Sequence, residues 1–581
     1  MNPRARTRKL TIVAQDPAVS DADGQILTAE VDVPAEELAR GPLGYRVHVI
    51  DYDGSTRTLY APLEYELTPD GEPVDPFRNP SNGTILNNPQ FHAQNVYAIV
   101  MRTLARFEFA LGRRISWGFN GHQLKVAPHA FADANAFYSE VDQALMFGYF
   151  PGRTGTVFSC LSHDVVAHET THALIDGLRA RFTDPSSPDQ AAFHEGFSDV
   201  IALLSVYSLR DVVQAVLDRT LDGTARGQAR KNVRLMHESD LTREALRKSL
   251  LFGLAKEMGR ELAGVRGDAL RRSIELKPED VTAEEFQEPH RRGEILVAAM
   301  MNAFLNVVVD RLDKLGRIEG KFFDRERVAE EAAESADYLL TMSIRALDYT
   351  PPVHIEFPDF LSALVTADHE IRPDDSKYQF RKNLIASFRQ YGIKPDARTS
   401  KPEGFWLPPT GRVVNDRIRF ESMTRDPDEV FRFVWENRVT LGLSEGAFTR
   451  ILSVRPCLRV APDDGFALRE TVAECMQQLR IPAGELATFG IDKPPEMPDD
   501  LEVSLEGGFT LIFDEYGHLK FAIGKRLFDK TRPEVQEKQS KRLADLWRYG
   551  HYRRGASLTR RFSAIHRLRS LGTARTFGEE W

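Results

Sequence analysis

Cysteine is scarce in this sequence. The 581-residue chain has only three cysteines, Cys160, Cys457 and Cys475, and none belongs to a CxxC pair. This usage supports neither a disulfide framework nor a thiolate zinc site. A reducing cytoplasm fits it best.

Long apolar segments are also missing. The first residues carry positive charge but lack the apolar stretch of about seven or more residues that a secretory signal needs, so we expect a cytoplasmic protein. The longest nearly apolar run, residues 295–309, contains two asparagines and is shorter than the roughly 20 residues that cross a bilayer. It predicts a buried helix, and no membrane span is expected.

The composition is that of an ordinary globular protein, with 42% hydrophobic residues, 28% charged residues and a formal charge of −9. Because there is no overall basic excess, nucleic acid is not an expected partner. The exception is residues 541–570, which are rich in Lys and Arg with aromatic residues between them. This segment could contact nucleic acid or an anionic membrane, but a solvated amphipathic helix is the commoner explanation.

Three units are predicted along the chain. Residues 1–87 form a β-rich unit and linker, since residues 45–50 and 59–67 alternate like strands around the turn signal Asp53-Gly54. Residues 88–393 are mostly helical from about 158 onward, and residues 394–581 follow a segment rich in proline and glycine.

Two local patterns are specific enough to set element boundaries. Apolar residues at three- and four-residue spacing predict a helix from Gln90 to Leu111 that stops at Gly112. Two alternating runs, residues 509–513 and 519–523, predict a hairpin in the C-terminal unit. Mixed patterns of this kind place the chain in the α+β class.

The segment SHDVVAHETTHALIDGLR carries the chemistry. A helix that begins near Ser162 places His168 and His172, four residues apart, on one face. Zinc accepts neutral histidine nitrogens, and a catalytic site uses three protein ligands so that one position stays open for water. Glu169 directly follows the first histidine, so its carboxylate can serve as general base without binding the metal.

AAFHEGFSDV supplies the third ligand after a turn-like break. We predict that Glu195 completes the metal site. Asp199 lies one helical turn further on and can accept the remaining N–H of a ligand histidine, which fixes its tautomer. A polar helix face is the alternative explanation of the HExxH string taken alone.

The combination DVVAHETTHAL and EGFSD resembles the thermolysin family of gluzincin zinc peptidases, and the resemblance covers roughly residues 88–393. It extends to FHAQNVYAIVMRTLARFEFALG, NAFYSEVDQALMFG, GDALRRS, PHRRGEILVAAMMNAF and FPDFLSALVTAD through NLIASFRQYGI. It implies an N-terminal α/β lobe with a substrate-binding edge strand and a mostly helical C-terminal lobe. The gap between His172 and Glu195 is longer than in the best-known members, which suggests a distinct branch.

The resemblance also implies roles for further residues. Asn135 and the backbone of Ala136 would hold the substrate main chain, and His290 would donate to the oxyanion with Glu285 as its orienting carboxylate. The substrate-clamping arginine maps to Arg271 or Arg272. Three of these roles have a plainer alternative. Asn135 could satisfy a turn, and His290 could be a surface or capping histidine. Arg271 and Arg272 could be solvated helix residues.

Two features of the family are incomplete here. Phe182 and Thr183 stand near the place of its auxiliary tyrosine. Asp164 matches a calcium ligand, but the acidic residue expected one helix later falls near Val206, so calcium dependence is doubtful.

The sequence therefore predicts an endopeptidase that binds one zinc ion and hydrolyses peptide or protein substrates. An aminopeptidase-type zinc hydrolase is disfavoured, since no GxMxN stretch is present. The alternative from another class is a non-catalytic or latent zinc-binding scaffold with a protein-binding role, against which the retained Glu169 argues.

Overall fold

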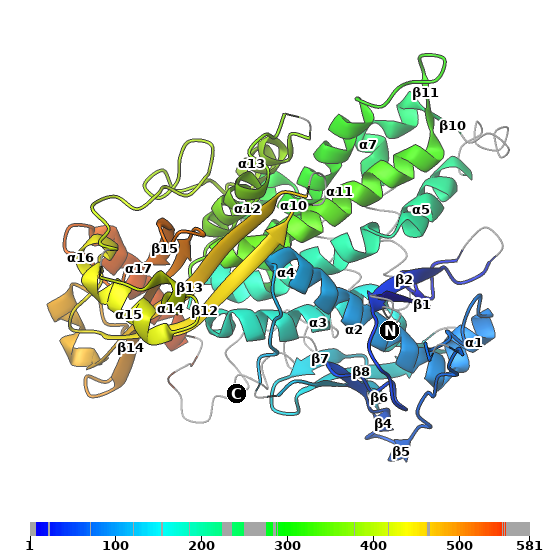
Figure 1. Ribbon diagram of the computed structural model, residues 1–581, viewed down its shortest axis with the longest axis horizontal. Coiled ribbons are helices and arrows are strands. Elements are labelled where there is room, and N and C mark those ends of the chain that lie inside the picture. Colours follow the sequence, from blue (N-terminus) through cyan, green and yellow to red (C-terminus); the bar gives the residue numbers. More distant parts are fainter. Residues whose placement is uncertain are drawn as a thin grey trace.

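The structure, a computed structural model, describes residues 7–20, 24–69, 71–119, 121–152, 155–184, 186–222, 235–248, 273, 275–282, 286, 289–376, 378–415, 417–461, 465–548, 550 and 552. It mixes 44% helix with 23% strand, so the predicted α+β class is confirmed. The two kinds of element are segregated along much of the chain (Figure 1).

The N-terminal segment is a set of short strands packed on the first long helix. Its elements are β1 (Thr7–Val13), β2 (Thr28–Pro34), β3 (Val47–Val49), β4 (Tyr52–Asp53), β5 (Thr58–Leu59) and α1 (Asn82–Asn87). β1 and β2 form an antiparallel ribbon that contacts α2. The short helix α1 lies where a linker was expected, and the Ser81 hydroxyl caps it by accepting from the Thr84 N–H.

The helix predicted from Gln90 to Leu111 is confirmed as α2 (Pro89–Leu111). Gly112, which follows it, has a φ of 67°, the left-handed conformation that commonly ends helices. The helix begins with Pro89, and proline is favourable at the first helical position because the N–H it lacks would have no partner within the helix.

A five-stranded sheet lies beside α2 and α3 (Figure 1). Its strands are β3, β6 (Leu124–Phe131), β7 (Ala136–Ser139), β8 (Ala144–Pro151) and β9 (Thr156–Phe158). The order is β3-β6-β8-β7, with β9 paired to β8, so β7 is an edge strand.

In the described part of the next region, from η1 to α13, the elements are helical apart from the short strand pair β10 and β11. The 3-10 turn η1 (Ser159–Leu161) leads into α3 (His163–Leu178), α4 (Pro188–Tyr207), α5 (Arg210–Asp222), β10 (Leu235–His237), α7 (Arg243–Leu246), α10 (Pro289–Leu312), β11 (Phe322–Asp324), α11 (Arg325–Ala346), α12 (Phe357–Ile371) and α13 (Phe380–Gln390). The helix predicted to begin near Ser162 is confirmed as α3.

The helix expected over residues 295–309 is the central part of α10. Its segment Arg291–Leu312 is long and apolar enough to cross a membrane, but 78% of its most apolar window is buried inside the protein. It packs against α4, α11 and α13. This packing is that of a core helix.

The C-terminal segment forms an antiparallel sheet with short helices. Its elements are α14 (Phe420–Met423), α15 (Pro427–Glu436), α16 (Arg438–Leu441), β12 (Phe448–Val460), β13 (Ala467–Pro482), β14 (Glu502–Phe513), β15 (Leu519–Lys525) and α17 (Pro533–Arg548). The predicted hairpin is confirmed as β14 and β15. In Figure 1 these helices gather at one end of the molecule. Beyond Arg548, most of the predicted basic tail lies outside the described residues.

Buried ion pairs join this sheet to the helical region. Arg459 on β12 is fully buried and contacts Asp348, which follows α11. Arg179, directly after α3, pairs with Glu474 on β13. The sheet thereby contacts the end of the helix that carries the HExxH motif.

One large hydrophobic core cluster runs from Leu10 to Trp406 and also includes Ile512, Phe521 and Ile523. Smaller clusters lie within the C-terminal segment. The three-unit division at residues 87 and 393 stays a prediction, although β3 shares a sheet with β6 and the N-terminal ribbon shares the core of the helices.

Candidate metal centre

His168, His172 and Glu195 come from two helices, α3 and α4, and the start of α4 has a local cause. α4 begins at Pro188, and the Ser187 side chain caps it by accepting from the Gln190 N–H. A Cβ on Gly196 would lie 2.9 Å from the Gly293 carbonyl oxygen. Only glycine therefore lets α4 approach α10 this closely, and the contact is one residue from Glu195.

The predicted ligands come together. His168 and His172 on α3 and Glu195 on α4 offer ligand atoms that all lie within 4.8 Å of one another. The two Nε2 atoms are 2.8 Å apart. Each also lies 3.6 Å from one oxygen of the Glu195 carboxylate. Two nitrogens and a carboxylate thus face a common point.

The outer ring nitrogens have partners of their own. Nδ1 of His168 lies 2.7 Å from Oδ1 of Asp199, the contact expected from the one-turn spacing. Nδ1 of His172 lies 2.7 Å from Nδ1 of His194, and the Ser198 hydroxyl lies 3.3 Å from the same Nδ1. These partners orient both rings with Nε2 toward Glu195.

The donor set fits zinc. Zinc prefers imidazole nitrogens and carboxylate oxygens, and two nitrogens on one tetrahedral zinc at about 2.0 to 2.1 Å lie about 3.3 Å apart. The observed separation of 2.8 Å is only slightly shorter. A small rotation of either ring would reach the expected value.

Glu169 connects the cluster to the sheet. Its side chain is fully buried, and Oε2 accepts a hydrogen bond of 3.1 Å from the backbone N–H of Tyr138. Tyr138 lies on β7, the edge strand. The carboxylate is therefore held between the histidine-bearing helix and the strand predicted to receive substrate.

A second carboxyl on α3 has an altered pKa. Burial, and then the negative charge of Glu140, raise the pKa of Asp176 to about 6, while the Tyr138 hydroxyl opposes this by donating to its Oδ2 at 3.0 Å. A Cβ on Gly118 would collide with this carboxylate. Asp176 thus sits tightly packed one turn beyond His172.

The predicted substrate residues are only partly described. Asn135 and Ala136 are buried at the start of β7, where the Asn135 side-chain oxygen accepts from the Ala136 N–H. His290 lies in the first turn of α10, but its side chain is outside the described residues, as are Glu285, Arg271 and Arg272. Phe182 is buried against Phe193. Asp164 lies in the first turn of α3.

His194, Ser198 and Tyr138 were not predicted as site residues. His194 directly precedes Glu195, and Ser198 belongs to the EGFSD string. Their closeness in sequence to Glu195 is the signal that could have indicated them. The backbone contact of Tyr138 has no signal in the sequence, because it depends on how α3 packs against β7.

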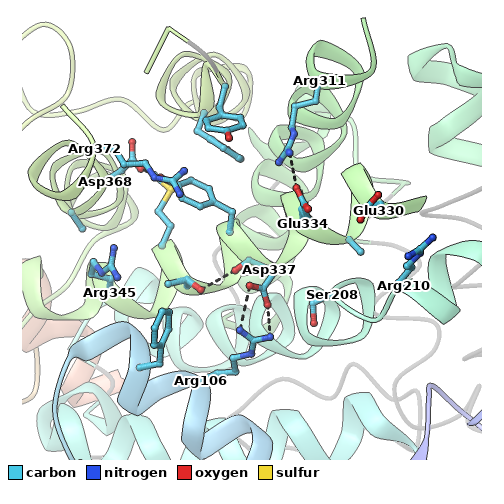
Figure 2. Close-up of a pocket in the computed structure, with 18 residues that line it drawn as sticks. Arg106, Ser208, Arg210, Arg311, Glu330, Glu334, Asp337, Arg345, Asp368 and Arg372 are labelled. Carbon is cyan, nitrogen blue, oxygen red and sulfur yellow. Dashed lines mark hydrogen bonds and ion pairs between the residues drawn. The ribbon is translucent and has the colours of Figure 1, made fainter. Parts of the chain in front are cut away.

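A cavity of about 550 Å³ lies away from this cluster, among α2, α11, α12 and the turn before α5 (Figure 2). Charged side chains line it, and several pair with each other, such as Arg106 with Asp337 and Arg311 with Glu334. It shares no residue with the histidine cluster.

No family model matches the chain, and no curated protein sequence is significantly similar to it.

Proposed function

We propose that the protein is a zinc-dependent endopeptidase whose residues 88–393 form a thermolysin-like catalytic domain. One observation carries the proposal. The Nε2 atoms of His168 and His172 converge on the Glu195 carboxylate, while each Nδ1 is held by a separate partner.

Glu169 is the general base. Glu169 directly follows His168, a ligand in this proposal. The Glu169 carboxylate is therefore close to the metal without being needed as a fourth ligand. Bound zinc would supply Lewis acidity and bring the pKa of water near 7. Glu169 accepts the proton of the attacking water and returns it to the leaving amine, acting as base and acid in turn.

Substrate binds as an added strand. β7 is the edge of the described sheet, and the Tyr138 N–H on this strand already holds Glu169. An extended peptide paired to β7 would therefore run past the general base, with Asn135 and Ala136 at the start of the strand. His290 lies in the first turn of α10, and Gly293 on the same helix contacts Gly196, the residue after Glu195; this proximity supports the proposed role of His290 as oxyanion donor.

A latent or non-catalytic zinc scaffold is the second candidate, and burial favours it. The exposed fractions of His168, His172, Glu195 and Glu169 are 3% or less. A peptide reaches such a buried centre only if the segments of this protein that cover it move aside. In a scaffold, zinc would stabilise the contact between α3 and α4 and no cleavage would occur.

The test is metal analysis of wild type and Glu169→Gln, combined with mass-spectrometric cleavage mapping on a diverse peptide pool. We expect zinc in both proteins and cleavage by wild type alone, since glutamine cannot take the proton. Glu403→Gln, at an exposed position far along the chain, is the matched control and should cleave like wild type. Zinc without cleavage in wild type would favour the scaffold, and equal cleavage by Glu169→Gln would refute the mechanism.

A further inference from the structure

A second cluster of metal-ligating side chains lies in the N-terminal half of the fold. His92 on α2, His129 on β6 and Cys160 in η1 offer ligand atoms that all lie within 4.8 Å of one another. All three are buried, with exposed fractions of 1%, 2% and 0%. They come from segments that are far apart in the sequence and share no residue with the centre at His168.

The inner nitrogens face each other as they do at the first centre. Nδ1 of His92 lies 2.8 Å from Nε2 of His129, the same separation as between the Nε2 atoms of His168 and His172. The thiol of Cys160 completes a set of two imidazoles and one sulfur. Zinc and copper both accept this donor set.

The outer nitrogens are held by acceptors. Nε2 of His92 donates to the Ile85 carbonyl oxygen at 2.8 Å. Nδ1 of His129 lies 2.9 Å from both carboxylate oxygens of Asp51. A carbonyl and a carboxylate are the usual outer partners of metal-binding histidines, because they fix the tautomer that leaves the inner nitrogen free to bind.

The surroundings suit a buried metal rather than an active site. The ring of Phe158 lies 4.9 Å from that of His92 and 5.1 Å from that of His129, and Tyr60 lies 5.1 Å from His129. Burial, and then Asp51, raise the pKa of the Cys160 thiol. A divalent ion would displace the thiol proton to solvent as the metal–sulfur bond forms.

We propose that His92, His129 and Cys160 bind a second transition-metal ion, zinc or copper, with a structural role. The ion ties together α2, β6 and the turn η1. Cys160 is three residues before His163, where α3 begins. The ion therefore fixes the start of the helix that carries His168 and His172.

Cobalt substitution of the full-length protein tests this without reference to peptidase activity. A thiolate bound to cobalt(II) gives a near-ultraviolet charge-transfer band, and the centre at His168 has no sulfur ligand. We expect the band in wild type, its loss in Cys160→Ser, and its persistence in Glu195→Gln. Cys475→Ser, which alters another buried cysteine on β13, is the matched control and should keep the band.

Elemental analysis gives the identity of the native ion. Wild type purified from medium containing both metals should hold about one equivalent more zinc or copper than Cys160→Ser.

If Cys160→Ser does not fold, the cobalt spectrum of the wild type tests the proposal by itself. Absence of the charge-transfer band in wild type, or its survival in Cys160→Ser, would overturn the proposal. In that case His92 and His129 form only a hydrogen-bonded chain from Ile85 to Asp51. Failure of the peptidase proposal leaves this result unaffected.

Discussion

Oδ1 of Asp199 lies 2.7 Å from Nδ1 of His168, one helical turn beyond Glu195 on α4. We propose that this carboxylate fixes the tautomer of the ring and directs its Nε2 toward the point that His172 and Glu195 also face. Partners of this kind raise the basicity of the ligand as well as orienting it.

Replacing this carboxylate should weaken metal binding without abolishing it. We expect Asp199→Ala to lower zinc affinity by about 10- to 100-fold, since the three ligands remain but one ring loses its orientation. Chelator competition measures the change. Asp211→Ala, at an exposed position in the first turn of α5, removes the same charge outside the cluster and should bind zinc like wild type. Equal affinity in both variants would mean that Asp199 has no orienting role.

The oxyanion donor should matter less than the base. We expect His290→Ala to lower kcat by about 10² to 10³, the usual effect of losing one positioned donor, and Glu169→Ala to lower it further. Steady-state kinetics on a mapped substrate measure both. His518→Ala, at an exposed histidine in the C-terminal segment, should leave kcat unchanged. A His290→Ala variant with wild-type kcat would remove this residue from the mechanism.

Asp176 gives the protein a pH dependence that one substitution can isolate. Its pKa is about 6 in the folded protein against an ordinary value of 3.8, mainly because of burial. The folded state therefore resists ionisation of this group, so its contribution to stability is highest below pH 4 and is lost as the pH rises through 6.

The variant Asp176→Asn cannot ionise, so it escapes this loss. Its stability relative to wild type should rise by up to about 3 kcal/mol between pH 4 and pH 8. Denaturant unfolding at the two pH values measures the difference. Asp500→Asn, at an exposed position, controls for the change in charge. A difference that does not vary with pH would show that Asp176 titrates normally.

The buried arginine on β12 is expected to be essential for the contact between the C-terminal sheet and the helices. Arg459 is fully buried and pairs with Asp348 and Glu470. Its loss leaves both carboxylates without this partner in the interior, so we expect Arg459→Met to lower the free energy of unfolding by about 3 to 5 kcal/mol. Arg469→Met, on the exposed face of the paired strand, is the control.

Acid should weaken the same contact. Burial alone would raise the pKa of Asp348, but Arg113 and Arg459 hold that pKa well below its ordinary value of 3.8. The stabilisation is present above pH 4 and is lost as the pH falls further toward the folded-state pKa. Asp348→Asn should therefore show a shallower loss of stability below pH 4 than wild type, measured by thermal unfolding. An identical acid dependence would contradict the role of this pair.

The local elements were predictable because their signals are local. Apolar spacing and Gly112 set the bounds of α2, and alternating residues set the hairpin of β14 and β15. The grouping of His168, His172 and Glu195 was predictable for the same reason. One helix holds His168 and His172 in place, and Glu195 lies on the next helix along the chain.

Tertiary structure alone decided the rest. The sequence shows three scattered cysteines and no reason to associate Cys160 with any histidine. His92, His129 and Cys160 meet only because α2, β6 and η1 pack around one core, and no spacing rule encodes contacts between elements so far apart. The hydrogen bond from Tyr138 to Glu169 has the same origin, since a backbone N–H is common to almost every residue and the packing of β7 on α3 selects which one is used.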